Sequence, residues 1–220
     1  MTTINAKLVA LTQPTIGVGA GSAEGLVAYC AKVSNPANQD SPDYERLLAY
    51  CVRNKHWSVF EMANAVVEVE APRDITRQLL RHRSFSFQEF SQRYSDQIEF
   101  TDREFRRQDS KNRQNSVDDL EEFVIEECIN HEVEVEDYAI GAYRWMREKG
   151  VAKECARVIL PEGLTMSRLY VNGTLRSWIH YLDVRDDEGV TQWEHVVLAR
   201  KIKEVLLPAF PTVFGLLENK

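Results

Sequence analysis

The stretch from residue 73 to residue 94 carries the densest set of side chains able to bind an anion. Arg73, Arg77 and Arg81 are spaced four apart, so on a helix they would share one face. The segment that follows, RHRSFSFQEFSQRY from Arg81 to Tyr94, alternates arginines with hydroxyl, amide and aromatic side chains. Because the whole chain has a net charge of −7, this local positive charge predicts an anionic partner. The plainer alternative is an exposed basic face paired with acidic neighbours.

A second group of cationic side chains follows in the C-terminal half, at Arg157, Arg176, His180 and Arg185. Arg176 and His180 are four apart and can share a helix face. A guanidinium group binds phosphate or carboxylate through two parallel hydrogen bonds, which an ammonium group cannot match. The two groups together predict a ligand with several anionic groups and a hydrogen-bonding ring. A nucleotide and a phosphosugar both fit these residues.

Other chemistries have weaker support. The run Gly17-x-Gly19-x-Gly21 is followed by Ser22 where a dinucleotide-binding loop needs glycine, so we expect a surface loop with Ser22 as a helix cap. His131-Glu132 lacks the second histidine of a zinc-protease helix, and no histidine has metal-ligand spacing. No Cys-x-x-Cys occurs, which favours buried reduced thiols at Cys30, Cys51, Cys128 and Cys155.

The elements that position these groups follow from the apolar periodicity. In the first half it predicts strands at 6–12, 63–71, 85–87 and 97–100, and helices at 23–33, 42–55 and 72–80. In the last of these helices, Ile75, Leu79 and Leu80 would face the core. Residues 101–116 are polar and predicted to be mobile. The second half predicts a strand at 164–171, a turn at Asn172-Gly173, and helices at 152–160, 175–184 and 192–207.

The longest helical pattern covers residues 117–149 and ends before Gly150, which suits the helix C-terminus. Its apolar stripe is expected to pack against the domain, with His131 on the stripe and the acidic residues from 118 to 137 in solvent. The stripe recurs every three or four residues at Leu120, Val124, Cys128, His131, Val135, Tyr138, Ala142 and Trp145.

Composition limits the class of protein. The 220 residues are 44% hydrophobic and 28% charged, which predicts one α/β domain, residues 1–220, with a helical subdomain at about 117–150. No apolar run approaches the ~18 residues of a membrane span. The N-terminal segment lacks a signal-peptide core, so we expect a cytoplasmic protein without membrane contact. The acidic balance argues against a general nucleic-acid-binding surface.

The spaced motif Arg81-His82-Arg83-x-x-Ser86-x-x-Glu89-x-Ser91-x-Arg93-Tyr94 resembles the signature of the flavin-dependent thymidylate synthases. The likeness extends over nearly the whole chain. It includes His56-x-Ser58-x-Phe60-Glu61, Ala156-Arg157-x-x-Leu160-Pro161, the segment from Arg176-Ser177 to Arg185, and Gln192-Trp193-Glu194. The resemblance implies the thymidylate synthase-complementing fold, a mostly antiparallel central sheet flanked by helices. It also implies a homotetramer with active sites shared between chains.

The same resemblance implies the reaction. Members of this family convert dUMP to dTMP with 5,10-methylenetetrahydrofolate as carbon donor, FAD reduced by NADPH as hydride source, and no cysteine nucleophile. The scattered cysteines agree with a cysteine-free route. The residues alone leave open a non-catalytic nucleotide- or RNA-binding module that uses the arginine cleft, and a flavoprotein reductase that needs no folate.

The resemblance also implies roles for individual residues. Arg185 would be catalytic, polarising the pyrimidine as negative charge develops, and Arg157 would reach the nucleotide from a neighbouring subunit. The dUMP-binding set would be Gln78, Arg81, Glu89, Phe90, Ser91, Gln92, Arg93, Arg157 and Arg185. The FAD-binding set would be His56, Ser58, Arg81, His82, Arg83, Glu89, Thr174, Arg176 and His180, with no metal. For Ser58 and Arg176, helix capping and surface ion pairing stay open as alternatives.

The chain departs from the family pattern at several flavin-site positions. Gln88 stands where asparagine is usual, Met62 replaces a common histidine, and Thr174 is asparagine in some members. A histidine often found between Arg185 and Gln192 is missing. These differences bear on the flavin pocket and leave the implied reaction unchanged.

Overall fold

A four-stranded sheet forms the centre of the protein, whose computed structural model describes residues 2–17 and 21–217. The strand order is β1 (Asn5–Leu11), β2 (Asn64–Pro72), β6 (Met166–Thr174) and β3 (Ser86–Glu89). Every neighbouring pair is antiparallel. The expected mixed α/β fold with a mostly antiparallel sheet is confirmed.

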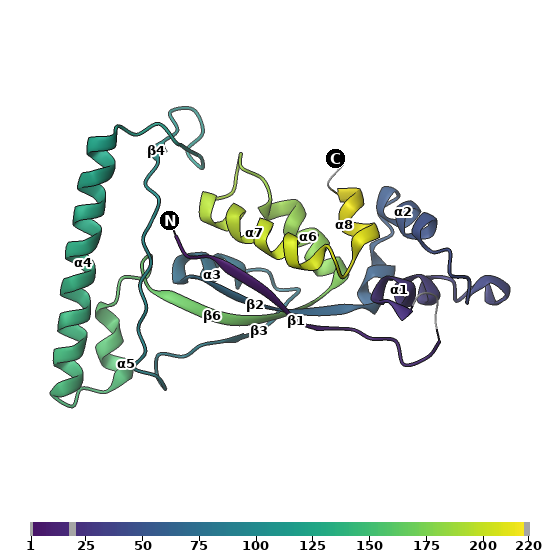
Figure 1. Cartoon of the computed structure of the whole chain (residues 1–220), viewed down its shortest axis with the longest axis horizontal. Coiled ribbons are helices and arrows are strands. Elements are labelled where there is room, and N and C mark those ends of the chain that lie inside the picture. Colours follow the sequence, from purple (N-terminus) through teal and green to yellow (C-terminus); the bar gives the residue numbers. More distant parts are fainter. Residues whose placement is uncertain (1, 18–20, 218–220) are drawn as a thin grey trace.

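One face of this sheet is apolar and the other is polar, because side chains alternate along each strand. In β2, Val67 and Val69 are fully buried, whereas Glu68 and Glu70, which alternate with them, lie on the opposite face. The buried face is covered by α6 (Leu175–Arg185) and α7 (Trp193–Leu206), as Figure 1 shows, and α8 (Pro211–Leu217) packs against α7. The polar face carries no helix in that view.

The predicted turn at Asn172-Gly173 is wrong, because both residues continue β6 and pair with β2. Gly173 is required there by packing rather than by a turn. A Cβ atom at Gly173 would collide with the ring of Phe85, which lies directly against the strand. Phe85 itself is buried and packs against Trp178 of α6, with ring centroids 4.4 Å apart and the ring planes tilted by 48°.

The helices at the far end of the sheet are α1 (Ala23–Ala31), α2 (Glu45–Arg53) and two short 3₁₀ helices, η2 (Pro36–Asn38) and η3 (Trp57–Met62). Ser22 caps α1 as predicted, since its Oγ accepts the N–H of Gly25 at 3.0 Å. The glycine run before it includes Gly19, which lies outside the described residues.

Helix α3 (Arg73–Leu79) is shorter than predicted, and this changes where its arginines lie. Ile75 and Leu79 are fully buried, as the apolar pattern indicated. Because the helix ends at Leu79, Arg81 lies in the following turn. The expected shared helical face is therefore wrong for Arg81, whereas Arg73 and Arg77 both lie on α3 and line one cavity.

The segment between β3 and the long helix is more ordered than expected. It contains a two-stranded ribbon, β4 (Arg107–Gln108) with β5 (Ser116–Val117), and the side chain of Arg103 is only 12% exposed. The predicted mobile excursion at 101–116 is wrong for these parts. The strand predicted at 97–100 is reduced to a single bridge between Phe100 and Thr165.

Helix α4 (Glu122–Glu148) stands at one end of the molecule and buries a different face from the one predicted. On the predicted stripe, Tyr138 is 80% exposed and Trp145 59% exposed. The face one residue further along is buried instead, with Ala139 at 4% and Tyr143 at 3%. The Tyr143 hydroxyl donates to Asp96 at 3.1 Å, which helps to fix this orientation.

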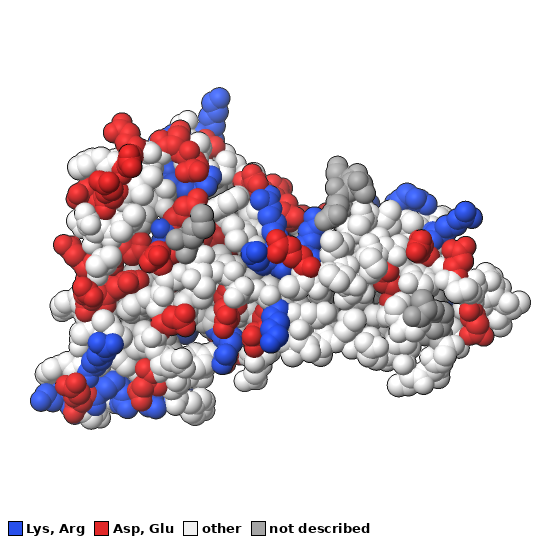
Figure 2. All heavy atoms as spheres, in the orientation of Figure 1, with Lys and Arg blue, Asp and Glu red and all other residues white. Residues whose placement is uncertain are grey.

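His131 on the predicted stripe is also exposed, with 75% of its side chain in solvent. Figure 2 shows acidic side chains gathered over this end of the molecule. After Gly150, whose positive φ of 82° suits a helix terminus, come α5 (Lys153–Ala156) and η4 (Arg157–Ile159). The division into one domain with a helical subdomain at 117–150 stays a prediction.

The cysteine prediction is only partly right. Cys51 is buried, but Cys30 and Cys128 are half-buried and Cys155 is exposed. Among the described residues, no helix is both long and apolar enough to span a membrane.

Candidate active site

Most of the predicted site residues fall into three groups, which α3 and α6 connect. The central group is Gln78, Arg81, His82 and Arg185. The second group lines a cavity of about 460 Å³, called the arginine cavity below, which lies beside Arg73 and Arg77 of α3. The η3 group, at the start of α6, is His56, Ser58, Arg176 and His180, together with Glu61, which was not a predicted site residue but pairs with Arg176.

In the central group, Arg185 is held by His82. The Nε of Arg185 donates to Nε2 of His82 at 3.0 Å. Burial lowers the pKa of His82 to about 4, and the positive charge of Arg185 adds to the effect. His82 is therefore neutral at neutral pH, with its proton on Nδ1. The terminal nitrogens of Arg185 form no ion pair with any residue that the structure describes, so they can contact a ligand.

Gln78, the member of the central group that lies on α3, contacts two side chains of the α7 segment. Its amide nitrogen donates to Oε1 of Gln192 at 2.7 Å. Its amide oxygen lies 3.3 Å from Nδ1 of His195, which is fully buried. The Gln78 side chain is thus held at the edge of the core.

The arginine cavity brings together side chains that can bind a phosphate group. Its lining residues are Arg73, Arg77, Gln92, Glu154, Arg157, Val158, Leu160, Glu162 and Thr165. Arg73 donates to Oε1 of Gln92 at 3.3 Å, and Arg77 pairs with Glu162. Burial lowers the pKa of Arg73, as do the nearby charges of Arg77 and Arg157, whereas Glu89 raises it. Converging guanidinium groups of this kind favour an anionic ligand.

The remaining nucleotide residues lie along β3 and the turn that follows it. Oγ of Ser91 accepts the N–H of Arg93 at 3.3 Å, and the Arg93 side chain pairs with Glu154 at the edge of the arginine cavity. Glu89 accepts a hydrogen bond from Ser167 on β6 at 2.8 Å. Phe90 lies elsewhere, lining a separate cavity of about 110 Å³ with Glu70 and Arg168 from the polar side of the sheet.

In the η3 group, side chains of η3 contact the first turns of α6. Arg176 forms an ion pair with Glu61, and the ring of His180 packs edge-on against Trp57 at 5.2 Å. Thr174 caps α6, since its Oγ1 accepts the N–H of Ser177 at 3.2 Å. The ring of His56 packs against Tyr50 at 5.5 Å.

The donor set of the η3 group and the turn after α3 fits a flavin dinucleotide. Arg81 and Arg83 are exposed, and within the described ranges neither forms an ion pair. Two unpaired cations suit a diphosphate, and imidazole and hydroxyl side chains suit a polar aromatic ring. Arg176 and Arg185 are nine residues apart on α6, about 14 Å at 1.5 Å per residue. A distance of this size leaves room along α6 for an extended dinucleotide near Arg176 and a smaller ligand near Arg185.

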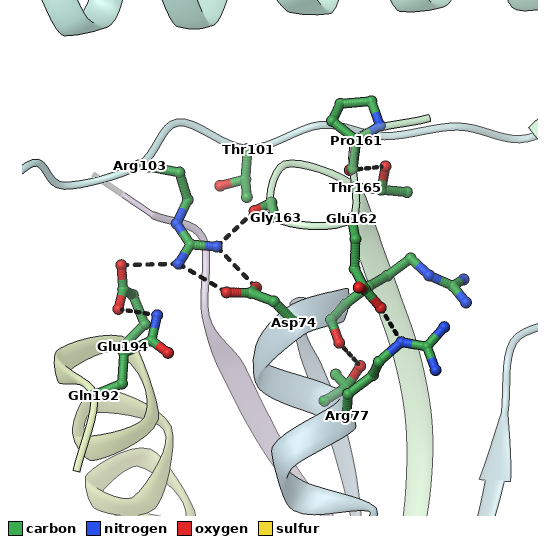
Figure 3. Close-up of polar contacts among 12 residues, drawn as sticks. Asp74, Arg77, Thr101, Arg103, Pro161, Glu162, Gly163, Thr165, Gln192 and Glu194 are labelled. Atoms are coloured by element: carbon green, nitrogen blue, oxygen red, sulfur yellow. Dashed lines mark hydrogen bonds and ion pairs between the residues drawn. The ribbon is translucent and has the colours of Figure 1, made fainter. Parts of the chain in front are cut away.

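Several polar residues behind the central group are absent from the predicted site. They are Arg103, Tyr181 and His195, whereas Gln192 and Glu194 are present only as part of a family segment. Arg103 joins Asp74 on α3 to Glu194 on α7, with distances of 2.9 and 3.0 Å, as Figure 3 shows. The available signal in the sequence was a polar side chain on the buried face of a helix, as at Tyr181 and His195.

Comparisons with known proteins identify the family. The family model described as "Thymidylate synthase complementing protein" matches residues 19–212. A flavin-dependent thymidylate synthase of Synechocystis sp. is 46% identical over 98% of this chain and 100% of its own length. A probable flavin-dependent thymidylate synthase of Paramecium bursaria Chlorella virus 1 is 44% identical over 96% of this chain and 97% of its own.

The fold is also found among solved structures. A UMP/dUMP methylase PolB from Streptomyces cacaoi, bound with 5-Br dUMP, superimposes with a TM-score of 0.82 at 23% identity, covering 99% of this chain and 96% of its own. These relatives do not support the alternative of a non-catalytic nucleotide- or RNA-binding module, because they are named as enzymes. The chain belongs to the thymidylate synthase complementing protein family.

Proposed function

We propose that this protein is a flavin-dependent thymidylate synthase, which methylates dUMP to dTMP. The observation that carries the proposal is the 46% identity, over nearly the full length of both chains, to a protein of that name. Its co-substrates are 5,10-methylenetetrahydrofolate and NADPH. The three groups of site residues divide the work of binding between nucleotide and flavin.

The nucleotide phosphate binds at the arginine cavity. Arg157 and Gln92 line it, and Ser91 and Arg93 come from the adjoining turn. A guanidinium group and an amide together offer several N–H donors to phosphate oxygens. Arg73, which the sequence marked as a candidate for anion binding but which is outside the implied dUMP-binding set, lines the same cavity and adds a further guanidinium group.

The pyrimidine binds at the central group, where Arg185 is the catalytic residue. Nε2 of His82 accepts the hydrogen bond that the Nε–H of Arg185 donates, which leaves the terminal N–H groups of Arg185 for a pyrimidine oxygen. A fixed cation beside the ring stabilises the negative charge that develops there during the reaction. Because His82 is neutral, it holds Arg185 without cancelling or adding to its charge.

FAD is held by the η3 group with Arg81, Arg83, Glu89 and Thr174, and His82 lies at the boundary with the nucleotide. When bound and reduced by NADPH, it supplies the hydride that completes the methyl group. No cysteine nucleophile is needed. Burial raises the pKa of the Cys51 thiol, which makes it a poor nucleophile. Of the described residues, no cysteine lines the arginine cavity.

The active form is a homotetramer with active sites shared between chains. The protein acts in the cytoplasm. Two features support shared sites. Phe90 lines a different cavity from Arg157, so one chain does not gather all the predicted nucleotide residues around one space. The exposed apolar stripe of α4 also offers a surface for a second copy, as does Tyr94 of the motif at 80% exposure.

The test is tritium release from dUMP labelled at C5, measured with and without folate and NADPH, alongside the flavin absorbance spectrum. Arg185→Ala should retain the flavin spectrum and lose roughly 100-fold or more in turnover, because it removes a positioned charge. The matched control is Arg53→Ala, an exposed arginine on α2 that should behave like the wild type. Normal turnover in Arg185→Ala would refute the assigned role, and a protein that binds no flavin would refute the proposed function.

A further inference from the structure

A chain of hydrogen bonds runs behind Gln78, from the segment after β3 to the middle of α6. Arg103 donates to Glu194 at 3.0 Å, and Gln192 donates to the other Glu194 oxygen at 3.0 Å. Figure 3 shows this first part. The series of hydrogen bonds continues from Gln192 to Gln78 at 2.7 Å and from Gln78 to His195 at 3.3 Å. It ends between His195 Nε2 and the Tyr181 hydroxyl at 3.1 Å.

The carboxylate at one end sets the direction of every bond in this chain. Glu194 is buried and paired with Arg103, so it only accepts. Gln192 must therefore turn its NH₂ toward Glu194 and its oxygen toward Gln78. Gln78 in turn must present its NH₂ to that oxygen, which leaves its own oxygen facing His195. An amide flipped at either glutamine would bring two oxygens together at one of these contacts.

The imidazole of His195, on the other side of Gln78, favours the same orientation of the Gln78 amide. His195 is fully buried, and burial lowers its pKa to about 3, with smaller contributions from Arg185 and His82. It is thus neutral and has one N–H. Nδ1 carries that hydrogen and donates to Gln78, so Nε2 accepts from the hydroxyl of Tyr181. Burial raises the pKa of Tyr181, which keeps the hydroxyl protonated and able to donate.

We propose that His195 and Tyr181 are positioning residues that hold the Gln78 amide with its NH₂ group toward the nucleotide, so that Gln78 donates to an acceptor oxygen of the substrate. One amide hydrogen goes to Gln192, and the second has no partner among the residues described. The inference rests on the proposed function, which places dUMP against Gln78. Because the proposed function places the pyrimidine at the central group, the expected acceptor is a pyrimidine carbonyl oxygen, and the test below distinguishes it from a phosphate oxygen.

The test measures the dissociation constants of dUMP and deoxyuridine for the flavin-loaded protein by calorimetry. His195→Leu removes the donor to Gln78 and should weaken dUMP binding about tenfold, the equivalent of one hydrogen bond. His195→Asn can place an amide N–H where Nδ1 lies and should restore affinity to within about twofold or threefold of the wild type. A role confined to folding predicts a lower melting temperature for His195→Leu with unchanged affinity, which would overturn the proposal.

If His195→Leu does not fold, a second variant tests whether Gln78 is a donor to the substrate. Gln78→Glu has nearly the same shape but only accepts when ionised, so it should weaken dUMP binding at least tenfold. Retained affinity would show that Gln78 is not a donor and would overturn the proposal. Weaker binding of both dUMP and deoxyuridine supports a pyrimidine oxygen as acceptor, whereas weaker binding of dUMP alone supports a phosphate oxygen.

The outcomes separate this inference from the proposed function. If the wild-type protein binds neither dUMP nor flavin, the proposed function fails and the inference with it. If the wild type binds dUMP and releases tritium while His195→Leu and Gln78→Glu keep full affinity, only the inference fails. Tyr181→Phe should show a smaller loss, about twofold to threefold, because His195 itself remains and can still donate to Gln78.

Discussion

At the scale of single residues, the central group depends on imidazoles that are kept neutral. His82 and His195 lie near Arg185, and burial is the largest cause of the lowered pKa of each ring. A protonated ring at either place would add a second positive charge beside the arginine. Neutral histidines therefore let Arg185 act as the cation of the central group without repulsion from these rings.

His195 should make the stability of the protein depend on pH. Its pKa is about 3 in the folded chain against 6.5 as the ordinary value, so between these values the unfolded chain binds more protons. The free energy of unfolding should therefore fall as the pH is lowered from about 6.5 toward 3, by up to about 1.4 kcal/mol per pH unit for this one group. In His195→Asn that contribution is absent.

The measurement is urea unfolding of both proteins at several values between pH 7.5 and pH 4. We expect the wild type to have the steeper slope, by about 1 kcal/mol per pH unit below pH 6. His82 is present in both proteins, so its titration cancels in the comparison. If the free energy of unfolding changed with pH equally in both proteins, burial would not lower the pKa of His195 in the folded chain.

At the scale of elements, the segment after β3 ties two helices together through one arginine. Arg103 bonds both carboxylate oxygens of Asp74 on α3, at 2.9 and 3.2 Å, and it also pairs with Glu194 on α7. Four residues along the same segment, Arg107 forms a similar two-bond pair with Asp119, but in solvent. The two pairs differ chiefly in burial.

Arg103→Ala should therefore cost about 3 kcal/mol of the free energy of unfolding, because it leaves buried Glu194 without its cation. Arg107→Ala, the matched control, should cost less than about 1 kcal/mol, since exposed ion pairs contribute little. Chemical denaturation of the two variants measures the difference. Equal losses would mean that burial does not decide the strength of these pairs.

Gly173 is the second element-scale case, because β6 tolerates no side chain where Phe85 packs against it. Gly173→Ala should destabilise the protein by roughly 1–3 kcal/mol through overpacking. Gly163→Ala is the control, as a Cβ atom there would meet nothing within 4 Å. A Gly173→Ala protein as stable as the control would show that the Phe85 ring can move aside without cost.

At the scale of the whole molecule, α4 presents apolar side chains to solvent that a single chain does not cover. Val135, Tyr138 and Trp145 are 48%, 80% and 59% exposed and recur with helical spacing. Patches of this kind mark contact surfaces. They support the proposed assembly of several copies.

The wild-type protein should sediment at several times the 25.4 kDa of one chain. The double variant Tyr138→Glu with Trp145→Glu should shift it toward the mass of one chain, because it buries charge in the contact. Val33→Glu, at an exposed apolar residue outside α4, should not. Analytical ultracentrifugation distinguishes these results, and an unchanged mass in the double variant would rule out the α4 surface as the contact.

The sequence by itself was enough for the elements whose patterns are local. Alternation at 63–71 predicted β2, the periodicity at 175–184 predicted α6, and Ser22 and Gly150 marked helix ends. It was also enough for the family, because the motif from Arg81 to Tyr94 keeps its spacing within one short segment. These features depend on neighbours a few residues away, and a sequence displays such neighbours directly.

Only the tertiary structure decided which faces are buried and which site residues meet. The buried face of α4 was misassigned because Asp96, far from the helix in sequence, holds Tyr143. The sequence predicted a turn at Asn172-Gly173 because the close approach of Phe85 to Gly173 exists only once β3 and β6 are paired. His195 contacts Gln78 across 117 residues of sequence. Contacts of this range arise from packing, so local spacing carries no record of them.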